Sequence, residues 1–283
     1  MPTPIPISKE FLHGFYKPIQ ASTHKGLQGH ALLIGGSYGK IGAVVLASKA
    51  ALKSGCGLVT SFVPRCGYTI LQTANPEVMV LTDEAEKHLS NIIYDIQPQA
   101  IGIGMGMGQD QATAVALHKF LKINNHPLLV DADALNLLAH NRAWLSLMPK
   151  HCVLTPHPKE LERLIGTWDP QSDMIDKTMA FAQQYQCIVV MKSAITLVTD
   201  GTSLYQNTTG NAALATAGSG DVLAGIITSL LAQSYSGMEA AALGVYLHGL
   251  TATIGVSDTG YQSFIASDCI AYLGKAYLSF ENN

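Results

Sequence analysis

The sequence Gly218-Ser219-Gly220-Asp221 stands directly before a long apolar stretch, and its residue types suit the binding of an anion. Glycine leaves the backbone amides of residues 218–220 unobstructed, and the helix expected at 220–233 would add the positive end of its dipole. A phosphoryl group is an anion that such a turn binds. We expect Asp221 to stay ionised beside these donors and to accept the proton of a hydroxyl that attacks phosphorus. The alternative, in which Asp221 only caps its helix, leaves the two glycines unexplained.

A second group of polar residues lies in Thr155-Pro156-His157-Pro158-Lys159-Glu160, after an apolar run. The two prolines stiffen this turn, so His157 is held before a helix at 158–165 and Glu160 lies in the first helical turn. A single histidine in such a place can serve either structure or function, and both interpretations stay open. No spacing of His and Cys in the chain fits a structural zinc site.

Two glycine-rich segments also follow expected strands. The segment 35–42, G-G-S-Y-G-K-I-G, differs from a P-loop because Ile41 occupies the position of the hydroxyl residue. It differs from a dinucleotide-binding fingerprint because the next strand ends in Arg65 rather than an acidic residue. A dinucleotide-binding turn, a plain tight turn and a ligand-contacting loop of another α/β fold all remain open. The alternating glycines of 102–108 indicate either a close approach of a ligand or crowded packing.

Two carboxylates follow a further apolar run, in Asp131-Ala132-Asp133-Ala134-Leu135-Asn136. Ligands of parallel sheets bind at the carboxyl ends of the strands, so this pair is a candidate for a binding site. For Asp133 alone, the favoured interpretation is that it caps the next helix.

Strands that alternate with helices would bring these segments to one edge of a parallel sheet, and the whole chain shows that alternation. The expected strands are apolar runs at 30–35, 57–63, 99–105, 127–132, 152–155, 187–191 and 196–200. The expected helices lie at 41–54, 110–122, 158–165, 173–185, 220–233 and 238–256. Asp200-Gly201 predicts a tight hairpin that adds an antiparallel edge. We therefore expect a single α/β domain over residues 1–283, with a central, mainly parallel sheet.

The composition excludes several classes of protein. Hydrophobic residues make up 48% of the 283 residues, which excludes intrinsic disorder. A net charge of −3 provides no basic field for nucleic acid or an anionic membrane, so we expect neither partner. Five cysteines without a C-x-x-C pair and an N-terminus interrupted by prolines indicate a cytoplasmic protein. The uncharged segment 240–257 contains small and polar residues, and we expect a buried helix there rather than a membrane span.

Several segments together resemble one family. The segment 218–225, G-S-G-D-V-L-A-G, looks like the anion-binding motif of the ribokinase-like superfamily, whose usual form is G-[TA]-G-D. Five more segments are similar, in chain order, to the ADP-dependent NAD(P)H-hydrate dehydratases: K-G-L-Q-G-H (25–30), G-G-S-Y-G-K-I-G-A (35–43), D-A-D-A-L-N (131–136), L-T-P-H-P-K-E-L (154–161) and K-S-A-I-T (192–196). Related vitamin kinases have T-P-N-x-x-E at 155–160, so His157 favours the dehydratases.

The resemblance implies a three-layer α/β/α fold of the ribokinase-like type and a role for each matched residue. Ala43, Gly106 and His157 would contact the hydrated dinucleotide (NADHX or NADPHX), and Asp221 would lie at its reacting hydroxyl. The adenine nucleotide, ADP or alternatively ATP, would be bound by two segments: Lys192, Ser193, Ala194, Ile195, Thr196, Gly218, Ser219 and Gly220. Serine replaces the family's usual glycine at 193. Glu160 matches the acidic position near Mg²⁺ and would act through water.

The implied activity is dehydration of hydrated NADH or NADPH with ADP as phosphoryl donor, a repair of damaged cofactor. Two alternatives stay open: an ATP-dependent kinase of a hydroxymethyl vitamin precursor, and a nucleotide-binding protein without catalytic activity. Many relatives carry an N-terminal hydrate epimerase domain. Only about two dozen residues precede the first motif, so we expect the epimerase to be a separate protein. The resemblance also implies a homo-oligomer, often a tetramer.

Overall fold

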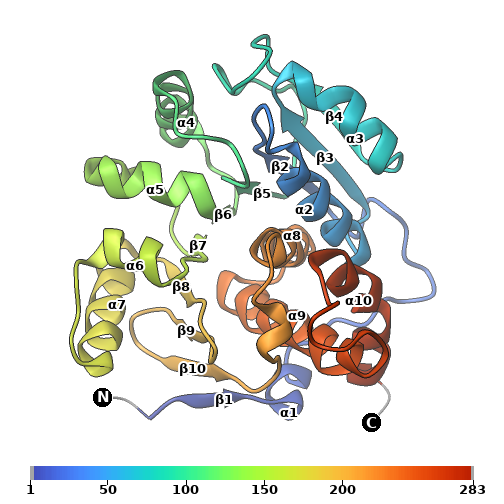
Figure 1. Cartoon of the computed structure of the whole chain (residues 1–283), viewed down its shortest axis with the longest axis vertical. Helices are drawn as coiled ribbons and strands as arrows, with labels where there is room; N and C mark the ends of the chain where they lie inside the picture. Colours follow the sequence, from blue (N-terminus) through green and yellow to red (C-terminus); the bar gives the residue numbers. More distant parts are fainter. Residues whose placement is uncertain (1–2, 282–283) are drawn as a thin grey trace.

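A computed structural model describes residues 3–281, and over this range ten strands form one sheet with the order β1-β10-β9-β8-β7-β6-β5-β2-β3-β4 (Figure 1). The strands are β1 Ile5–Ile7, β2 His30–Ile34, β3 Leu58–Val63, β4 Met79–Thr82, β5 Ala100–Ile103, β6 Leu128–Val130, β7 Val153–Leu154, β8 Ile188–Met191, β9 Leu197–Thr199 and β10 Leu204–Asn207. The pairs β8–β9 and β9–β10 are antiparallel and the others are parallel. The mainly parallel sheet and its antiparallel edge are therefore confirmed.

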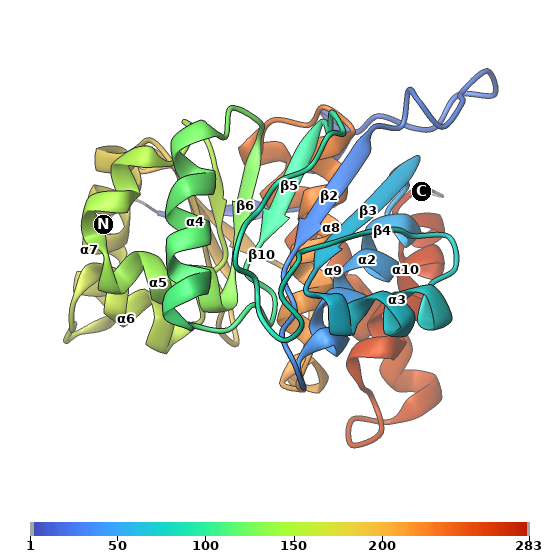
Figure 2. The same ribbon diagram turned by 90° about the horizontal axis from the view of Figure 1, so that it is seen from above.

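The helices cover both faces of the sheet. They are α1 Lys9–His13, α2 Ile41–Lys53, α3 Tyr68–Ala74, α4 Gln111–Ile123, α5 Ala132–His140, α6 Pro158–Ile165, α7 Gln171–Tyr185, α8 Ser219–Ala232, α9 Gly237–Thr259 and α10 Ala266–Glu281, with short 3-10 helices η1 Arg65–Gly67, η2 Arg142–Leu147 and η3 Ala212–Leu214. Helices α4 to α7 lie on one face, and α2, α3, α8, α9 and α10 on the other (Figure 2). The three-layer arrangement is the predicted one.

Alternation along each strand divides the core between these two faces. In β2, Ala31 and Leu33 pack with α2 and α8, while Leu32 and Ile34 point to the opposite face. All four side chains are buried, because helices cover both sides. This double burial is why the strands are visible in the sequence as continuous apolar runs.

The elements that sequence analysis did not predict lie mostly at the edges. Strand β1 pairs only with β10, and an edge position tolerates the prolines that flank Ile5. Strand β4 is the opposite edge and is only partly buried. Helix α10 buries Cys269, Leu273, Ala276 and Phe280 at helical spacing against α9 and α2.

The connections change direction between β2 and β5, two central neighbours in the sheet. From β2 the chain proceeds to β3 and β4 on one side, and from β5 it proceeds to β6, β7 and β8 on the other. The loops that leave the carboxyl ends of β2 and β5 therefore lead to opposite halves of the sheet. Ligands of such sheets usually bind at this point, between the ends of the two strands, which is called the crevice below.

Helix α9, which contains the uncharged segment 240–257, is long and apolar enough to cross a membrane by length and composition alone. It lies against α8 and α10, and 67% of its most apolar window is buried. That burial is the behaviour of a core helix, as predicted. All five cysteines are free thiols.

Candidate active site

The carboxyl ends of the central strands bring the predicted residues to one edge. Strand β5 leads to Gly106, β6 to Asp131, β7 to His157 and β8 to Lys192. Helix α8 packs on β5, β2 and β6, and its N-terminus carries Asp221. Segments far apart in the sequence thus converge, because parallel strands all end on the same side.

The N-terminus of α8 forms the predicted anion-binding turn. Gly218 is the N-cap residue, and no side chain caps the helix, so Asp221 is free of the capping role. Gly218 has φ +86°, a left-handed conformation that favours glycine, and a Cβ atom there would also lie 2.5 Å from the Leu46 Cδ1 atom of α2. The Ser219 N–H donates to the Thr216 carbonyl at 3.3 Å, whereas the Gly218 and Gly220 amides have no side-chain partner among the described residues and can receive an anion.

An ion pair lies directly beside this turn. The Lys192 Nζ atom is 2.9 Å from the Asp131 Oδ1 atom, and both side chains are largely withdrawn from solvent. A Cβ atom on Gly220 would come within 3.2 Å of Lys192 Nζ and 3.8 Å of Asp131 Oδ2. The cation and the helix N-terminus therefore face the same small volume, a combination suited to a phosphoryl group.

The Asp221 carboxyl group has an unusual acidity. Burial is the main cause that raises its pKa to about 7; Asp131 raises it as well, and Lys192 opposes them. Burial thus works against the ionised form that we predicted for Asp221. A pKa close to the working pH suits a general base.

His157 and Glu160 form a reciprocal cap at the start of α6. The Glu160 carboxylate accepts a hydrogen bond from the His157 backbone N–H at 2.9 Å, and His157 Nδ1 accepts one from the Lys159 N–H. His157 Nε2 lies 3.3 Å from Glu160 Oε1. Burial raises the pKa of Glu160 to about 7 and lowers that of His157. His157 is exposed at the mouth of the site, while Glu160 is buried behind it.

Gly106 and Ala43 meet across the crevice between β5 and β2. Gly106 has φ +62°, and a Cβ atom there would lie 2.6 Å from the Lys40 carbonyl oxygen and 3.0 Å from the Ala43 Cβ atom. The Ser37 hydroxyl donates a 2.8 Å hydrogen bond to the Gly106 carbonyl and joins the two loops. The glycines of 102–108 thus allow close contact between two loops at the mouth of the crevice.

Asp133 does not cap its helix, contrary to the favoured interpretation. The N-cap of α5 is Asp131, which makes no capping bond. Asp133 instead accepts hydrogen bonds from the Gly108 N–H at 2.9 Å and from Gln109 Nε2 at 3.0 Å. Lys40 Nζ lies 3.5 Å from the same carboxylate. Asp133 therefore fixes the loop that follows β5.

The segment 193–196 connects β8 to β9 at the same edge. Residues 193–195 are exposed, and the Ser193 hydroxyl donates to the Ile195 carbonyl within the turn. The Lys192 N–H donates to the Pro156 carbonyl at 3.0 Å, which ties this turn to the segment that carries His157. Lys192, at the start of this segment, lies next to Gly220 of the anion-binding turn. The two predicted nucleotide segments are therefore neighbours.

Sequence analysis missed His248, a buried residue of α9. Its Nε2 atom lies 3.1 Å from the Ser219 hydroxyl, and both side chains are buried. Burial lowers the pKa of His248 to about 4, so the imidazole is neutral at physiological pH. The one available signal was a histidine within an otherwise apolar helix, which requires a polar partner when buried.

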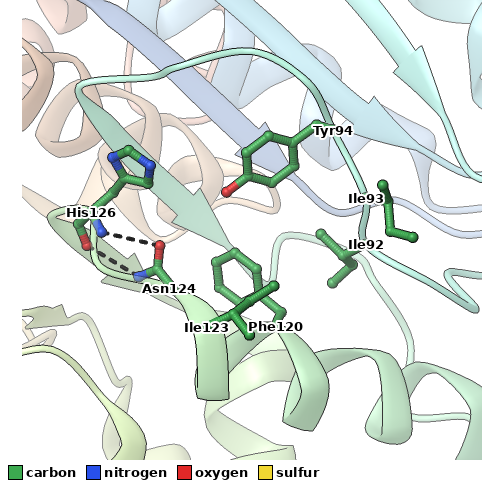
Figure 3. Close-up of a pocket in the computed structure, with 7 residues that line it drawn as sticks. All are labelled: Ile92, Ile93, Tyr94, Phe120, Ile123, Asn124 and His126. Carbon is green, nitrogen blue, oxygen red and sulfur yellow. Dashed lines mark hydrogen bonds between the residues drawn. The ribbon is translucent and has the colours of Figure 1, made fainter.

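Two further features lie outside this arrangement. The described residues contain no group of three or more His, Cys, Asp or Glu side chains placed to hold a metal ion. A small cavity of about 180 Å³ lies between the segment before β5 and the end of α4, and Figure 3 shows its lining. It is lined by Ile92, Ile93, Tyr94, Phe120, Ile123, Asn124 and His126. His126 stands just before β6, so this cavity is near the amino ends of the strands, opposite the converging residues.

Comparison with known proteins identifies the family. The family model described as NAD(P)H-hydrate dehydratase matches residues 31–273. The chain belongs to the NAD(P)H-hydrate dehydratase family. The ADP-dependent (S)-NAD(P)H-hydrate dehydratase of Neisseria meningitidis is 37% identical over 262 residues, which are 90% of this chain and 87% of that protein.

Solved structures agree with the family in fold. An ADP/ATP-dependent NAD(P)H-hydrate dehydratase from Bacillus subtilis, co-crystallised with ATP and Mg²⁺, has a TM-score of 0.83 and 26% identity over 99% of this chain and all of that one. A ribokinase-like superfamily protein from Enterococcus faecalis has a TM-score of 0.82 and 26% identity, over 99% and 97% of the two chains. The ribokinase-like fold is thereby confirmed. The chain spans about half the length of the curated relatives it matches first, which are bifunctional NAD(P)H-hydrate repair enzymes.

Proposed function

We propose that this member of the NAD(P)H-hydrate dehydratase family restores NADH or NADPH from their hydrated forms, with ADP as phosphoryl donor. The observation that carries the proposal is the position of Asp221. Its carboxyl group, with a pKa raised to about 7, stands at the N-terminus of α8 beside the Lys192–Asp131 ion pair. A base and two sources of positive potential are thus combined where a phosphoryl group would transfer.

The chemistry follows from the substrate. The hydrated ring carries a hydroxyl on the carbon beside its nitrogen, and hydroxide leaves poorly at neutral pH. Asp221 accepts the hydroxyl proton as that oxygen attacks the β-phosphorus of ADP, and AMP leaves. The ring nitrogen then expels phosphate, and loss of a proton from the adjacent carbon restores the reduced cofactor. Phosphorylation thus converts a poor leaving group into a good one.

Each matched residue has a role in this scheme. The amides of residues 218–220 and the Lys192 ammonium neutralise charge on the transferring group. Lys192, Ser193, Ala194, Ile195 and Thr196 hold the nucleotide together with Gly218, Ser219 and Gly220. Ala43, Gly106 and His157 contact the hydrated dinucleotide. The dinucleotide binds at the crevice between β2 and β5.

Mg²⁺ would fit the site as an ion held mainly by the nucleotide. Mg²⁺ keeps several waters and takes few protein carboxylates. Among the described residues no cluster is able to ligate a metal directly, and both Glu160 oxygens already face His157. The buried Glu160 carboxylate would therefore act through water, and the ion would neutralise phosphate charge.

We further propose a cytoplasmic homo-oligomer, a tetramer by resemblance, that works with a separate hydrate epimerase. Two relatives support a pairing of two activities, because both are named bifunctional NAD(P)H-hydrate repair enzymes.

The test combines purified protein, hydrated NADH or NADPH, Mg²⁺ and either ADP or ATP. We expect the dihydronicotinamide absorbance to return as ADP is converted to AMP. Asp221→Asn should lower turnover by several orders of magnitude and leave nucleotide affinity within a few-fold. Asp173→Asn is the matched control, since that carboxylate lies on α7 and pairs with Lys177 at the surface, away from the proposed chemistry. Comparable turnover of Asp221→Asn would overturn the assignment of the base, and phosphorylation of a vitamin precursor instead would favour the kinase.

A further inference from the structure

The turn Ser37-Tyr38-Gly39-Lys40, which follows β2, has an exposed aromatic residue in a rigid setting. The Lys40 N–H donates to the Ser37 carbonyl at 2.8 Å, and Gly39 has φ +84° at the third position, so the four residues form a hydrogen-bonded turn. The Ser37 hydroxyl holds this turn to Gly106. Tyr38 is nonetheless 69% exposed at the tip.

A second loop supports the Tyr38 ring. The Tyr38 N–H donates to the Lys87 carbonyl at 2.8 Å, and Lys87 Nζ lies 5.1 Å from the centre of the ring. Asp83 in turn fixes this second loop by accepting hydrogen bonds from Ala85, Ser90 and Asn91. The backbone of Tyr38 is therefore fixed and Lys87 lies over its ring, which lowers the entropic cost of stacking another group on the ring.

A cation on the same turn is free to move. Lys40 Nζ is 57% exposed, and its contact with Asp133 is long, at 3.5 Å. Asp133 keeps its hydrogen bonds to Gly108 and Gln109 when Lys40 moves away. Lys40 can therefore pair with a phosphate without leaving the Asp133 carboxylate unpaired. Beside this turn, Gly39 and Gly42 both border open space.

We propose that this turn binds the adenosine phosphate half of the hydrated dinucleotide, with Tyr38 stacked on the adenine base and Lys40 paired with a phosphate. The inference rests on the proposed function. The nucleotide segments lie at β8 and α8, so the part of the dinucleotide beyond the reacting ring extends the other way, past Gly106 and Ala43. The turn that carries Tyr38 and Lys40 adjoins Gly106, because a Cβ atom on Gly106 would lie 2.6 Å from the Lys40 carbonyl oxygen and the Ser37 hydroxyl bonds to the Gly106 carbonyl.

The test compares the dinucleotide with a truncated form. We would measure KM for hydrated NADH and for hydrated reduced nicotinamide mononucleotide, which lacks the adenosine phosphate half. Tyr38→Ala should raise KM for the dinucleotide roughly 5- to 100-fold, the range of one base stacked on an aromatic ring. Tyr38→Phe should keep the dinucleotide KM near the wild-type value, and KM for ADP should not change.

Lys40→Ala should raise the dinucleotide KM about three- to tenfold at low salt, whereas Lys49→Ala on the outer part of α2 should not. KM for the mononucleotide should be the same in all variants.

Binding provides a second measurement that needs no turnover. Wild-type protein should bind NADH more tightly than reduced nicotinamide mononucleotide, and Tyr38→Ala should reduce that advantage roughly fivefold or more. Equal affinities in the wild type, or an advantage that Tyr38→Ala leaves intact, would overturn the inference. If the wild-type protein binds NADH but turns over neither hydrated substrate, the proposed function is contradicted instead. Failure of this inference and failure of the proposed function can therefore be told apart.

Discussion

Asp221 and Glu160 are two carboxyl groups with the same raised pKa and different freedom to react. In both, burial is the main cause that raises the pKa to about 7. Both Glu160 oxygens face His157, which uses the carboxylate to hold the start of α6. Among the hydrogen bonds of residues 3–281, none involves the Asp221 carboxylate, so its lone pairs are available. This difference supports the proposal that Asp221 is the base and that Glu160 shapes the site.

The pH dependence of turnover should follow the Asp221 carboxyl group. A general base must be ionised, so kcat/KM should fall tenfold per pH unit below about pH 7. Asp131 raises the Asp221 pKa and Lys192 lowers it, so Asp131→Asn should move the break to lower pH and Lys192→Met should move it higher. Glu160→Gln should leave the break in place. A profile that is flat between pH 5.5 and 8 would contradict the assignment.

The same carboxyl group should make the ligand-free protein less stable at high pH. The folded-state pKa of Asp221 lies above its ordinary value, so the destabilisation is absent below about pH 4 and complete above about pH 7. Asp221→Asn should therefore raise the unfolding free energy at pH 8 by about 1–2 kcal/mol, after allowance for partial exposure, and by less at pH 5. Thermal unfolding at the two pH values measures this. If Asp221→Asn lowers the unfolding free energy by the same amount at pH 5 and pH 8, the buried Asp221 charge does not destabilise the protein.

At the scale of elements, a buried side-chain hydrogen bond joins α9 to the N-terminus of α8. The Ser219 hydroxyl and His248 Nε2 lie 3.1 Å apart, next to the amides of the anion-binding turn. Ser219→Ala would leave the imidazole nitrogen unpaired, which typically costs about 1–3 kcal/mol. We expect kcat to fall several-fold because the amides lose their fixed position, with KM for the dinucleotide unchanged.

A double-mutant cycle separates this contact from general destabilisation. Ser219→Thr should retain the hydroxyl and most of the activity, and His248→Leu should reduce kcat by a factor similar to that of Ser219→Ala. The double variant Ser219→Ala/His248→Leu should be no worse than either single one. Additive losses would mean that the two side chains act independently.

The sequence allowed these elements to be predicted where burial leaves a simple pattern. Strands buried on both faces are continuous apolar runs, and β2, β3 and β8 were located to within two residues. Strand β1 has only three residues and prolines around it, and β4 is a partly exposed edge, so neither has that pattern. Helix α10 does show helical spacing, in Cys269, Leu273, Ala276 and Phe280, but no motif drew attention to it.

The site could be predicted only as separate segments. The Lys192–Asp131 pair joins residues 61 positions apart, and the contact depends on the two strands ending at the same edge. The acidity of Asp221 depends on burial and on two neighbours from other strands, which local sequence does not show. The effect of burial on Asp221 could not be predicted for that reason. The role of Asp133 was missed likewise, since Gly108 is 25 positions away.

At the scale of the whole molecule, the proposed function assigns two binding regions to the sheet, on opposite sides of the proposed base Asp221. The nucleotide segments follow β8 and begin α8, while the crevice for the dinucleotide lies between β2 and β5, with β6 and β7 between them. Donor and acceptor thus approach Asp221 from different directions. A single rigid sheet fixes their separation, so phosphoryl transfer needs no movement of one domain on another.

This arrangement also predicts how complete the repair can be. A rigid crevice that presents one face of the hydrated ring to Asp221 should accept one of the two configurations at the hydroxyl carbon, and the Neisseria meningitidis relative is named for the (S) form. With ADP in excess and a mixture of both epimers, we expect recovery of the reduced cofactor to stop when the (S) form is consumed. Addition of a separate hydrate epimerase should carry recovery to completion, and chromatography of the two epimers over time measures both stages. Complete consumption of both epimers by this protein alone, at equal rates and faster than they interconvert spontaneously, would mean that the crevice does not select a configuration and that Asp221 can reach the hydroxyl on either face.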